Sequence, residues 1–102
     1  MILGPYRALT PEYSKAINDH YPYQVQVNVQ WLGKGARTLA PIDYWCEERY
    51  GLTAKRRYQC WDDDDFVSIN YDLDIEKRWL RRITSYHFQD ADHAFEFKMR
   101  WG

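Results

Sequence analysis

The stretch Tyr23-Gln24-Val25-Gln26-Val27-Asn28-Val29-Gln30-Trp31 decides the fold class of this chain. Apolar and polar residues alternate strictly along it, so an extended backbone places every apolar side chain on one face. This pattern predicts a strand over residues 23–31 that is packed on one side and wet on the other. Leu32-Gly33-Lys34-Gly35 ends the predicted strand.

Helix signals lie on both sides of this strand. Thr10 before Pro11 is typical of an N-cap followed by a first helical residue, and it predicts a short helix that the breakers from Asn18 to Pro22 soon end. A second, amphipathic helix is predicted over residues 41–50, with Gly51 directly after it as a C-terminal cap. Its apolar arc is formed by Ile42, Trp45, Cys46, Arg49 and Tyr50.

The second half of the chain alternates between both kinds of pattern. Strands are predicted over 55–61 and 66–71, joined by a turn at Asp62–Asp65, and over 84–88. A helix is predicted over 74–83, because Ile75, Trp79, Leu80 and Ile83 share one helical face; the alternative is one long hairpin through this stretch. Asp90 caps a last predicted helix that runs to Trp101. Residues 1–9 show no period.

The predicted elements indicate one α+β domain over residues 1–102. Helices that cover mainly one face of an antiparallel sheet form a two-layer sandwich, and the strand-helix-strand start suggests a variant of the ferredoxin-like plan. The 102 residues suffice for one domain of ordinary size.

The last helix has an apolar arc that covers more than half of the helical wheel, too wide for burial against a sheet alone. A second contact is therefore expected, with another helix or with another copy of the chain in a homodimer. The arc is formed by Ala91, Ala94, Phe95, Phe97, Met99 and Trp101.

Composition excludes several classes of protein. The chain has 14 Lys and Arg against 15 Asp and Glu, a net charge of −1, which argues against nucleic acid or an anionic membrane as the partner. Hydrophobic residues make up 45% and aromatic residues 18%, too much for a disordered chain. No apolar run is long enough to cross a bilayer, and the N-terminus does not resemble a signal peptide. We expect a cytoplasmic protein in which Cys46 and Cys60 are reduced.

No arrangement in the sequence predicts catalysis, a cofactor or a metal. Phosphate-binding glycine loops, nucleophile elbows and paired metal-binding histidines do not occur. The run Asp62–Asp65 lacks the alternate spacing of a calcium loop and is expected to be a solvated hairpin tip. His87 and His93 with Asp90 and Asp92 fit no known metal spacing, and Asp90 already has a function as a cap.

The C-terminal stretch Tyr86-His87-Phe88-Gln89-Asp90-Ala91-Asp92-His93-Ala94-Phe95-Glu96-Phe97-Lys98-Met99-Arg100-Trp101 resembles the ending of many small uncharacterised proteins of tailed bacteriophages. Those endings read roughly aromatic-x-Phe-x-Asp-x-x-(Asp/His)-Ala-x-x-Phe-Lys-Leu-Arg-Trp. The segment Trp45-Cys46-Glu47-Glu48-Arg49-Tyr50-Gly51 is similar to their Trp-Cys-Glu-x-x-Phe-Gly segment. The resemblance implies a small α+β sandwich of ferredoxin-like type and brings no activity with it.

Together these observations predict a phage accessory protein that binds another protein, which could be a protein of the host, and catalyses nothing. Trp, Tyr and Arg are enriched at binding hot spots, and this short chain has 5 Trp and 9 Tyr. The residues expected on the binding surface are Trp61, Trp79, Arg81, Arg82, Phe95 and Met99.

Two other classes of function stay open. The clusters Lys55–Arg57 and Lys77–Arg82, interleaved with aromatic residues, could hold phosphates and stack bases in a nucleic-acid-binding module. A small dimeric enzyme of ferredoxin-like type would instead need a pocket between sheet and helices.

Overall fold

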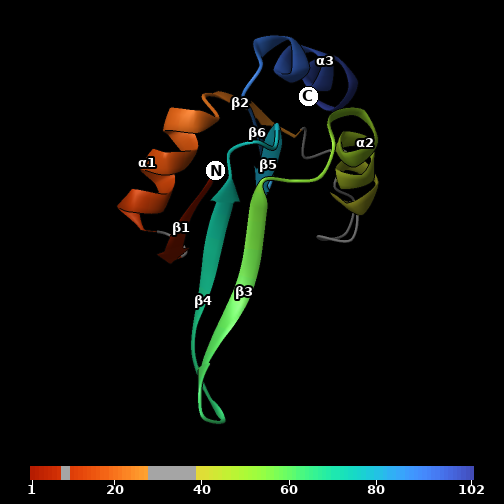
Figure 1. The fold of residues 1–102 in the computed structure, drawn as a ribbon. Coiled ribbons are helices and arrows are strands. Elements are labelled where there is room, and N and C mark those ends of the chain that lie inside the picture. Colours follow the sequence, from red (N-terminus) through yellow and green to blue (C-terminus); the bar gives the residue numbers. More distant parts are fainter. Residues whose placement is uncertain (8–9, 28–38) are drawn as a thin grey trace.

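A computed structural model describes residues 1–7, 10–27 and 39–102 of the chain. The elements in order are β1 (Ile2–Arg7), α1 (Pro11–His20), β2 (Tyr23–Gln26), α2 (Ala40–Tyr50), β3 (Lys55–Asp62), β4 (Asp65–Asp74), β5 (Trp79–Arg82), β6 (Ser85–Phe88) and α3 (Ala91–Trp101). Figure 1 shows their arrangement. The predicted α+β sandwich with antiparallel strands is confirmed.

The strands form two three-stranded antiparallel sheets, with the strand orders β1-β4-β3 and β2-β6-β5. In the first sheet Lys55 lies opposite Leu73, and in the second Trp79 lies opposite Phe88. A ferredoxin-like plan has its strands in one sheet, so the division into two sheets is a difference from that plan.

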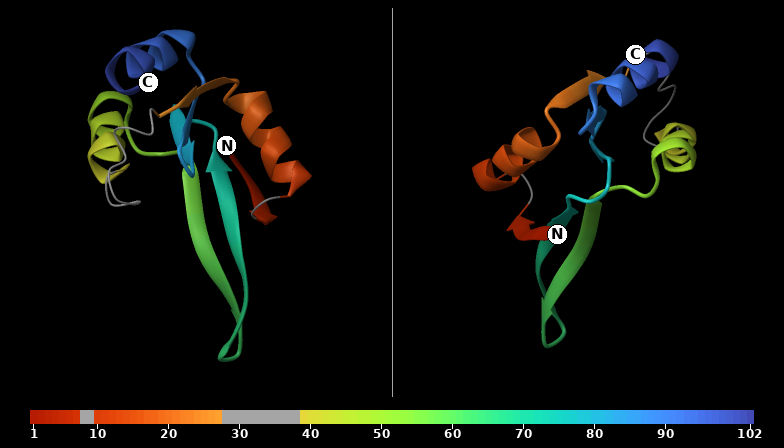
Figure 2. Two further views of the ribbon diagram at one scale, coloured as in Figure 1. Left: turned by 180° about the vertical axis from the view of Figure 1, so that it is seen from behind. Right: turned by 45° about the horizontal axis from the view of Figure 1, so that its top comes forward.

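Buried hydrophobic side chains lie on both faces of the second sheet. One face, with Tyr86 and Phe88, packs against α2 and α3 and forms what we call the first core. Leu80 belongs to a second core, with Tyr13, Ile17 and Tyr21 at α1. Figure 2 shows α1 on one side of the strands and α2 and α3 on the other. The second sheet is therefore the layer that joins the two cores.

The three predicted helices that flank the strands are confirmed. The hydroxyl of Thr10 accepts a hydrogen bond from the Tyr13 amide at 3.4 Å, as an N-cap should. The helix then runs on to His20, beyond the expected stop, and Lys15 and Asp19 form an ion pair one turn apart within it. The carboxylate of Asp90 caps α3 by accepting from the Asp92 amide at 2.7 Å.

The alternating strand is confirmed over Tyr23–Gln26, and Val27, just beyond its end, continues the pattern of burial. Val25 and Val27 are buried, whereas Gln24 and Gln26 are exposed. Tyr23, the first residue of β2, is exposed although it belongs to the predicted apolar face. The remaining predicted positions, 28–31, lie outside the described residues.

The predicted helix over 74–83 is wrong; the stretch contains the end of β4, a turn and β5, close to the hairpin alternative. The carboxylate of Asp74 accepts a hydrogen bond from the Glu76 amide at 3.2 Å, which stabilises a turn instead of a helix start. Trp79 and Leu80 are both buried, but in different cores. A strand that is buried on both faces has apolar residues at adjacent positions. In the sequence, such neighbours resemble the apolar face of a helix.

Strand β1 was not predicted, because Gly4-Pro5 interrupts its pattern. The register between β1 and β4 shifts between Leu3 and Tyr6, so the interruption lies in a bulge. Gly4 has a φ of +124° and would place a Cβ 3.0 Å from the Tyr71 carbonyl oxygen, so a side chain has no room there. Proline is tolerated at an edge strand and at a bulge, and β1 offers both.

Candidate partner-binding surfaces

Strands β3 and β4 form a hairpin that projects from the body of the molecule, which we call the arm (Figures 1 and 2). The two strands pair from Lys55 and Leu73 to Asp62 and Asp65. Strand β1 supports β4 only at positions from Asn70 to Asp74. Beyond that point the arm is a two-stranded ribbon, and a ribbon of two strands cannot bury its own side chains.

The arm tip, defined here as residues 61–67, exposes large apolar side chains. Trp61, Phe66 and Val67 are 57%, 51% and 54% exposed. The rings of Trp61 and Phe66 meet edge to face with centroids 5.6 Å apart. A register shift next to Trp61 marks a bulge in the ladder, and bulges redirect side chains. The tip therefore presents a pair of aromatic rings in mutual contact to solvent.

The four carboxylates of the tip lie between these aromatic side chains. Asp63 has a φ of 53°, a left-handed conformation that Asp tolerates in tight turns. Asp62 lies directly opposite Asp65 in the ladder, so like charges face each other. No group of three or more His, Cys, Asp or Glu side chains in the described part of the chain is arranged to hold a metal ion.

The arm base, Lys55-Arg56-Arg57, meets part of the second basic cluster. The Lys55 ammonium lies 5.4 Å from the centre of the Tyr71 ring, and the Arg82 guanidinium lies 5.5 Å from that of Tyr13. Those two rings are stacked with centroids 5.2 Å apart. Burial, assisted mainly by the charge of Arg81, lowers the pKa of Lys55 to about 8. The fold thus gathers cations over tyrosine rings at this place.

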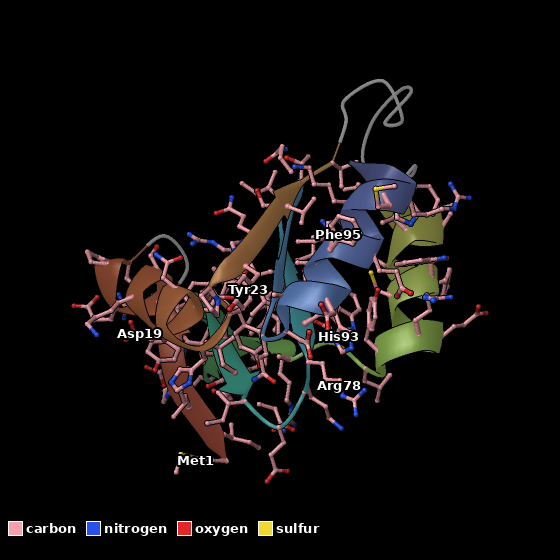
Figure 3. All side chains as sticks on the ribbon, turned by 90° about the horizontal axis from the view of Figure 1, so that it is seen from above. Met1, Asp19, Tyr23, Arg78, His93 and Phe95 are labelled. Atoms are coloured by element: carbon pink, nitrogen blue, oxygen red, sulfur yellow. The ribbon has the colours of Figure 1, made fainter. Side chains whose placement is uncertain are left out.

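Lys77 and Arg78 do not join that gathering. The Lys77 carbonyl accepts a hydrogen bond from the Tyr21 hydroxyl at 2.9 Å in the turn before β5. Arg78 borders a separate hollow near His93, and both are labelled in Figure 3. The predicted cluster Lys77–Arg82 is therefore divided between two ends of β5.

Trp79 is removed from the candidate binding surface, because it is only 2% exposed in the first core. Its indole N–H donates to the Gly51 carbonyl at 2.7 Å. Arg81 is half-buried and pairs with Asp43 at 3.2 Å. The Tyr86 hydroxyl donates to the same carboxylate at 2.5 Å, so Asp43 joins α2 to β5 and β6.

The last helix makes the second contact that its wide arc requires, and α2 supplies it. The Trp45 ring on α2 packs edge-on against Phe97 and Trp101 of α3. The Arg49 guanidinium holds the Glu96 carboxylate at 2.5 Å, which lowers the pKa of Glu96 to about 2. Phe95 and Met99 remain 66% and 74% exposed, and Phe95 is labelled on α3 in Figure 3.

An open pocket of about 300 Å³ lies between α2 and the starts of β3 and β5. Tyr44 and Trp79 form apolar walls, and Lys55, Asp43 and Arg81 contribute charges. Asp43 and Arg81 already neutralise each other there. The buried thiol of Cys46 has a raised pKa, chiefly because of burial, so it stays protonated.

The sequence predicts Trp61 on the binding surface but does not single out Phe66, although a signal for both is present. Aromatic residues flank the acidic run on both sides, Trp61 before it and Phe66 after it. A solvated hairpin tip does not require large apolar residues at its edges, so their presence indicates a contact surface. The length of the unsupported ribbon had no sequence signal, because it depends on where β1 stops pairing.

Comparisons with known proteins identify no family for this chain. No family model, no curated protein and no solved structure matches it. In the part of the chain that the structure describes, no helix has the length and apolar character needed to cross a membrane.

Proposed function

We propose that this protein is a non-catalytic accessory protein of a tailed bacteriophage and acts in the host cytoplasm by binding another protein through the arm tip. The observation that carries the proposal is the exposed aromatic pair Trp61 and Phe66 at the end of a projecting ribbon. Rigid aromatic side chains contribute most to binding when a partner covers them. The neighbouring carboxylates favour a partner with a basic rim around an apolar pocket.

The phage origin rests on the C-terminal motif, whose residues have clear structural duties. Asp90 caps α3, and Ala94 and Phe97 are buried in the first core. Trp101 packs against Trp45 at 6.3 Å, which also joins the two resembling segments. The duties of these residues are structural, and the resemblance itself implies no activity.

The test compares wild-type protein with a tip variant, W61S/F66S, and a matched control, Y44S. Tyr44 is also exposed, at 65%, but lies on α2, beside the arm base and away from the arm tip. Each protein is used to capture binding partners from a bacterial host lysate, and captured proteins are then purified and measured by calorimetry. The tip variant is expected to bind at least about tenfold more weakly, whereas the control binds as the wild type does. A partner that binds all three proteins equally would contradict the proposal.

A nucleic-acid-binding module is the second candidate, and one observation favours it. Lys55, Arg57 and Arg82 come together beside the stacked rings of Tyr13 and Tyr71, although they belong to two separate sequence clusters. Cations beside aromatic faces suit single-stranded nucleic acid. Retention on heparin at moderate salt, lost in R57E/R82E, would support this candidate, whereas free passage would support the protein partner.

Self-association through α3 also stays a prediction, now limited to Phe95 and Met99. These two side chains lie one helical turn apart and are both largely exposed. The small dimeric enzyme is left with the open pocket beside Lys55 as its only support in the described part of the chain.

A further inference from the structure

Strand β3 is the outermost strand of its sheet, whose order is β1-β4-β3. Among the described residues, no strand pairs with its outer edge. Figures 1 and 2 show this edge clear of other elements along the arm from opposite sides. An uncovered edge presents backbone N–H and C=O groups that can pair with another strand.

The charges along β3 change sign from one end to the other. The strand begins with Lys55-Arg56-Arg57 and leads into Asp62–Asp65. Within the described ranges, none of these seven residues forms an ion pair. The carboxylates of Asp62 and Asp65 even face each other across the ladder. Both the unpaired cations at one end and the crowded carboxylates at the other would be stabilised by opposite charges on an adjacent strand.

We infer that two copies of the chain pair through the outer edges of β3, antiparallel, around a two-fold axis near Tyr58–Cys60. An antiparallel arrangement places the arm base of each copy beside the arm tip of the other, so that opposite charges meet twice. A parallel arrangement would bring like charges together along the whole strand. Charges on an edge strand repel most foreign strands, but here the pattern is complementary to itself.

This inference goes beyond the proposed function because it uses the backbone edge of β3 and the arm base, although the carboxylates of the arm tip enter both. Backbone groups at the edge of a ribbon lie in the plane of the sheet, whereas side chains point to its faces. Phe66 lies on β4, the inner strand, so pairing of the β3 edges gives it no new strand neighbour, whereas Trp61 on β3 would lie opposite the 57–59 segment of the second copy. The variant F66S is therefore expected to dimerise like the wild type, so the two proposals can fail separately.

The test uses two variants with opposite charge changes. R56E/R57E makes the arm base acidic, and D62K/D64K/D65K makes the arm tip basic, with three lysines against one aspartate, while leaving the turn residue Asp63 unchanged. Each variant alone brings like charges together at both contacts, so its dimer dissociation constant is expected to rise at least about tenfold at low salt. An equimolar mixture of the two restores both contacts and is expected to form a heterodimer as tight as the wild-type dimer.

Sedimentation equilibrium over a concentration series measures the association, and circular dichroism shows that each variant is folded. Rescue by the mixture also excludes misfolding as the cause of the loss. Amide hydrogen exchange is expected to slow in residues 55–62 on dimerisation and to stay unchanged in α3. A wild-type chain that remains a monomer at about 1 mM would overturn the inference. The inference would also be overturned if neither charge variant weakened the dimer, or if the mixture of the two variants stayed monomeric. Loss of the dimer only in F95S/M99S would assign the interface to α3 instead.

Discussion

At the residue scale, His87 is the most unusual side chain of the interior. It is only 4% exposed, and neither ring nitrogen has a hydrogen-bond partner among the described residues. Burial lowers its pKa to about 4, and the charges of Arg82 and Lys55 act in the same direction. The folded protein therefore keeps this imidazole neutral where an exposed histidine would take up a proton.

This difference predicts a loss of stability in mild acid. Between pH about 6.5 and about 4, the unfolded chain binds a proton at His87 that the folded chain does not, so the free energy of unfolding falls as the pH falls. Glu96, whose pKa is lowered to about 2, adds its own loss only below its ordinary value of 4.5. Replacing His87 with Leu is expected to reduce the fall in melting temperature between pH 7 and pH 5. Equal falls in both proteins would contradict this account.

Burial of Lys55 makes the free energy of unfolding depend on pH in the alkaline range. Its pKa of about 8, lowered mainly by burial, lies below that of an exposed lysine. Between pH about 8 and about 10.5 the unfolded chain carries a proton that the folded chain has lost, so stability contributed at this site rises with pH. Lys55→Met keeps an unbranched apolar side chain, one atom shorter, and removes the charge. The variant is expected to be more stable than the wild type at pH 7 and to lose that advantage near pH 10. A wild type that is more stable at pH 7 would show that the contact with Tyr71 outweighs the cost of burial.

At the element scale, α3 has two sides with different duties. Phe97 is fully buried in the first core, whereas Phe95, two residues earlier, is 66% exposed. Phe97→Ala is expected to lower the free energy of unfolding by about 3–5 kcal/mol, because it removes an aromatic ring from a packed core. Phe95→Ala is expected to change it by less than about 0.5 kcal/mol. Urea unfolding of the two variants measures the difference, and similar losses would mean that another part of the chain covers Phe95.

The helices and the hairpin strands were predictable because their signals are local. Thr10 and Asp90 indicate helix starts because their side chains cap the first turn, and the strict alternation after Tyr23 fits only a strand. The stretch from Asp74 to Ile83 was not predictable in this way. Trp79 and Leu80 are buried in different cores, a fact that depends on α1 and α2 lying on opposite sides of β5. A local sequence pattern does not show whether helices pack on one face of a strand or on both.

The candidate surface was predictable only in part, for a related reason. The exposure of Trp61, Phe95 and Met99 agrees with their expected place on the surface. Trp79 looked the same in the sequence but is buried, because its neighbours come from distant parts of the chain. The gathering of Lys55 with Arg82 needed the meeting of two separate sheets. Long-range pairing decides such placements, and no spacing in a single sequence encodes it.

At the scale of the whole molecule, the second sheet joins two cores that have no buried residue in common among the described residues. The first core contains Trp45, Trp79 and Trp101, whereas the second, built around Ile17 and Leu80, contains no tryptophan among the described residues. The Ala54 amide donates to the Trp79 carbonyl at 2.8 Å, and the Asp74 amide donates to the Ala54 carbonyl at 2.9 Å. The backbone thus ties the two sheets together directly, and the cores should melt as one unit.

This connection can be tested by damaging one core and observing the other. Ile17→Ala removes volume from the second core and is expected to cost about 2–5 kcal/mol. In a background with Trp61→Phe and Trp31→Phe, the tryptophan signal comes from the first core alone. Because the shared sheet couples both layers, tryptophan fluorescence and far-ultraviolet circular dichroism are expected to report the same lowered melting temperature. If fluorescence kept its transition at the temperature of the undamaged background while circular dichroism showed an earlier step, the two cores would be independent units and the sheet only a spacer between them.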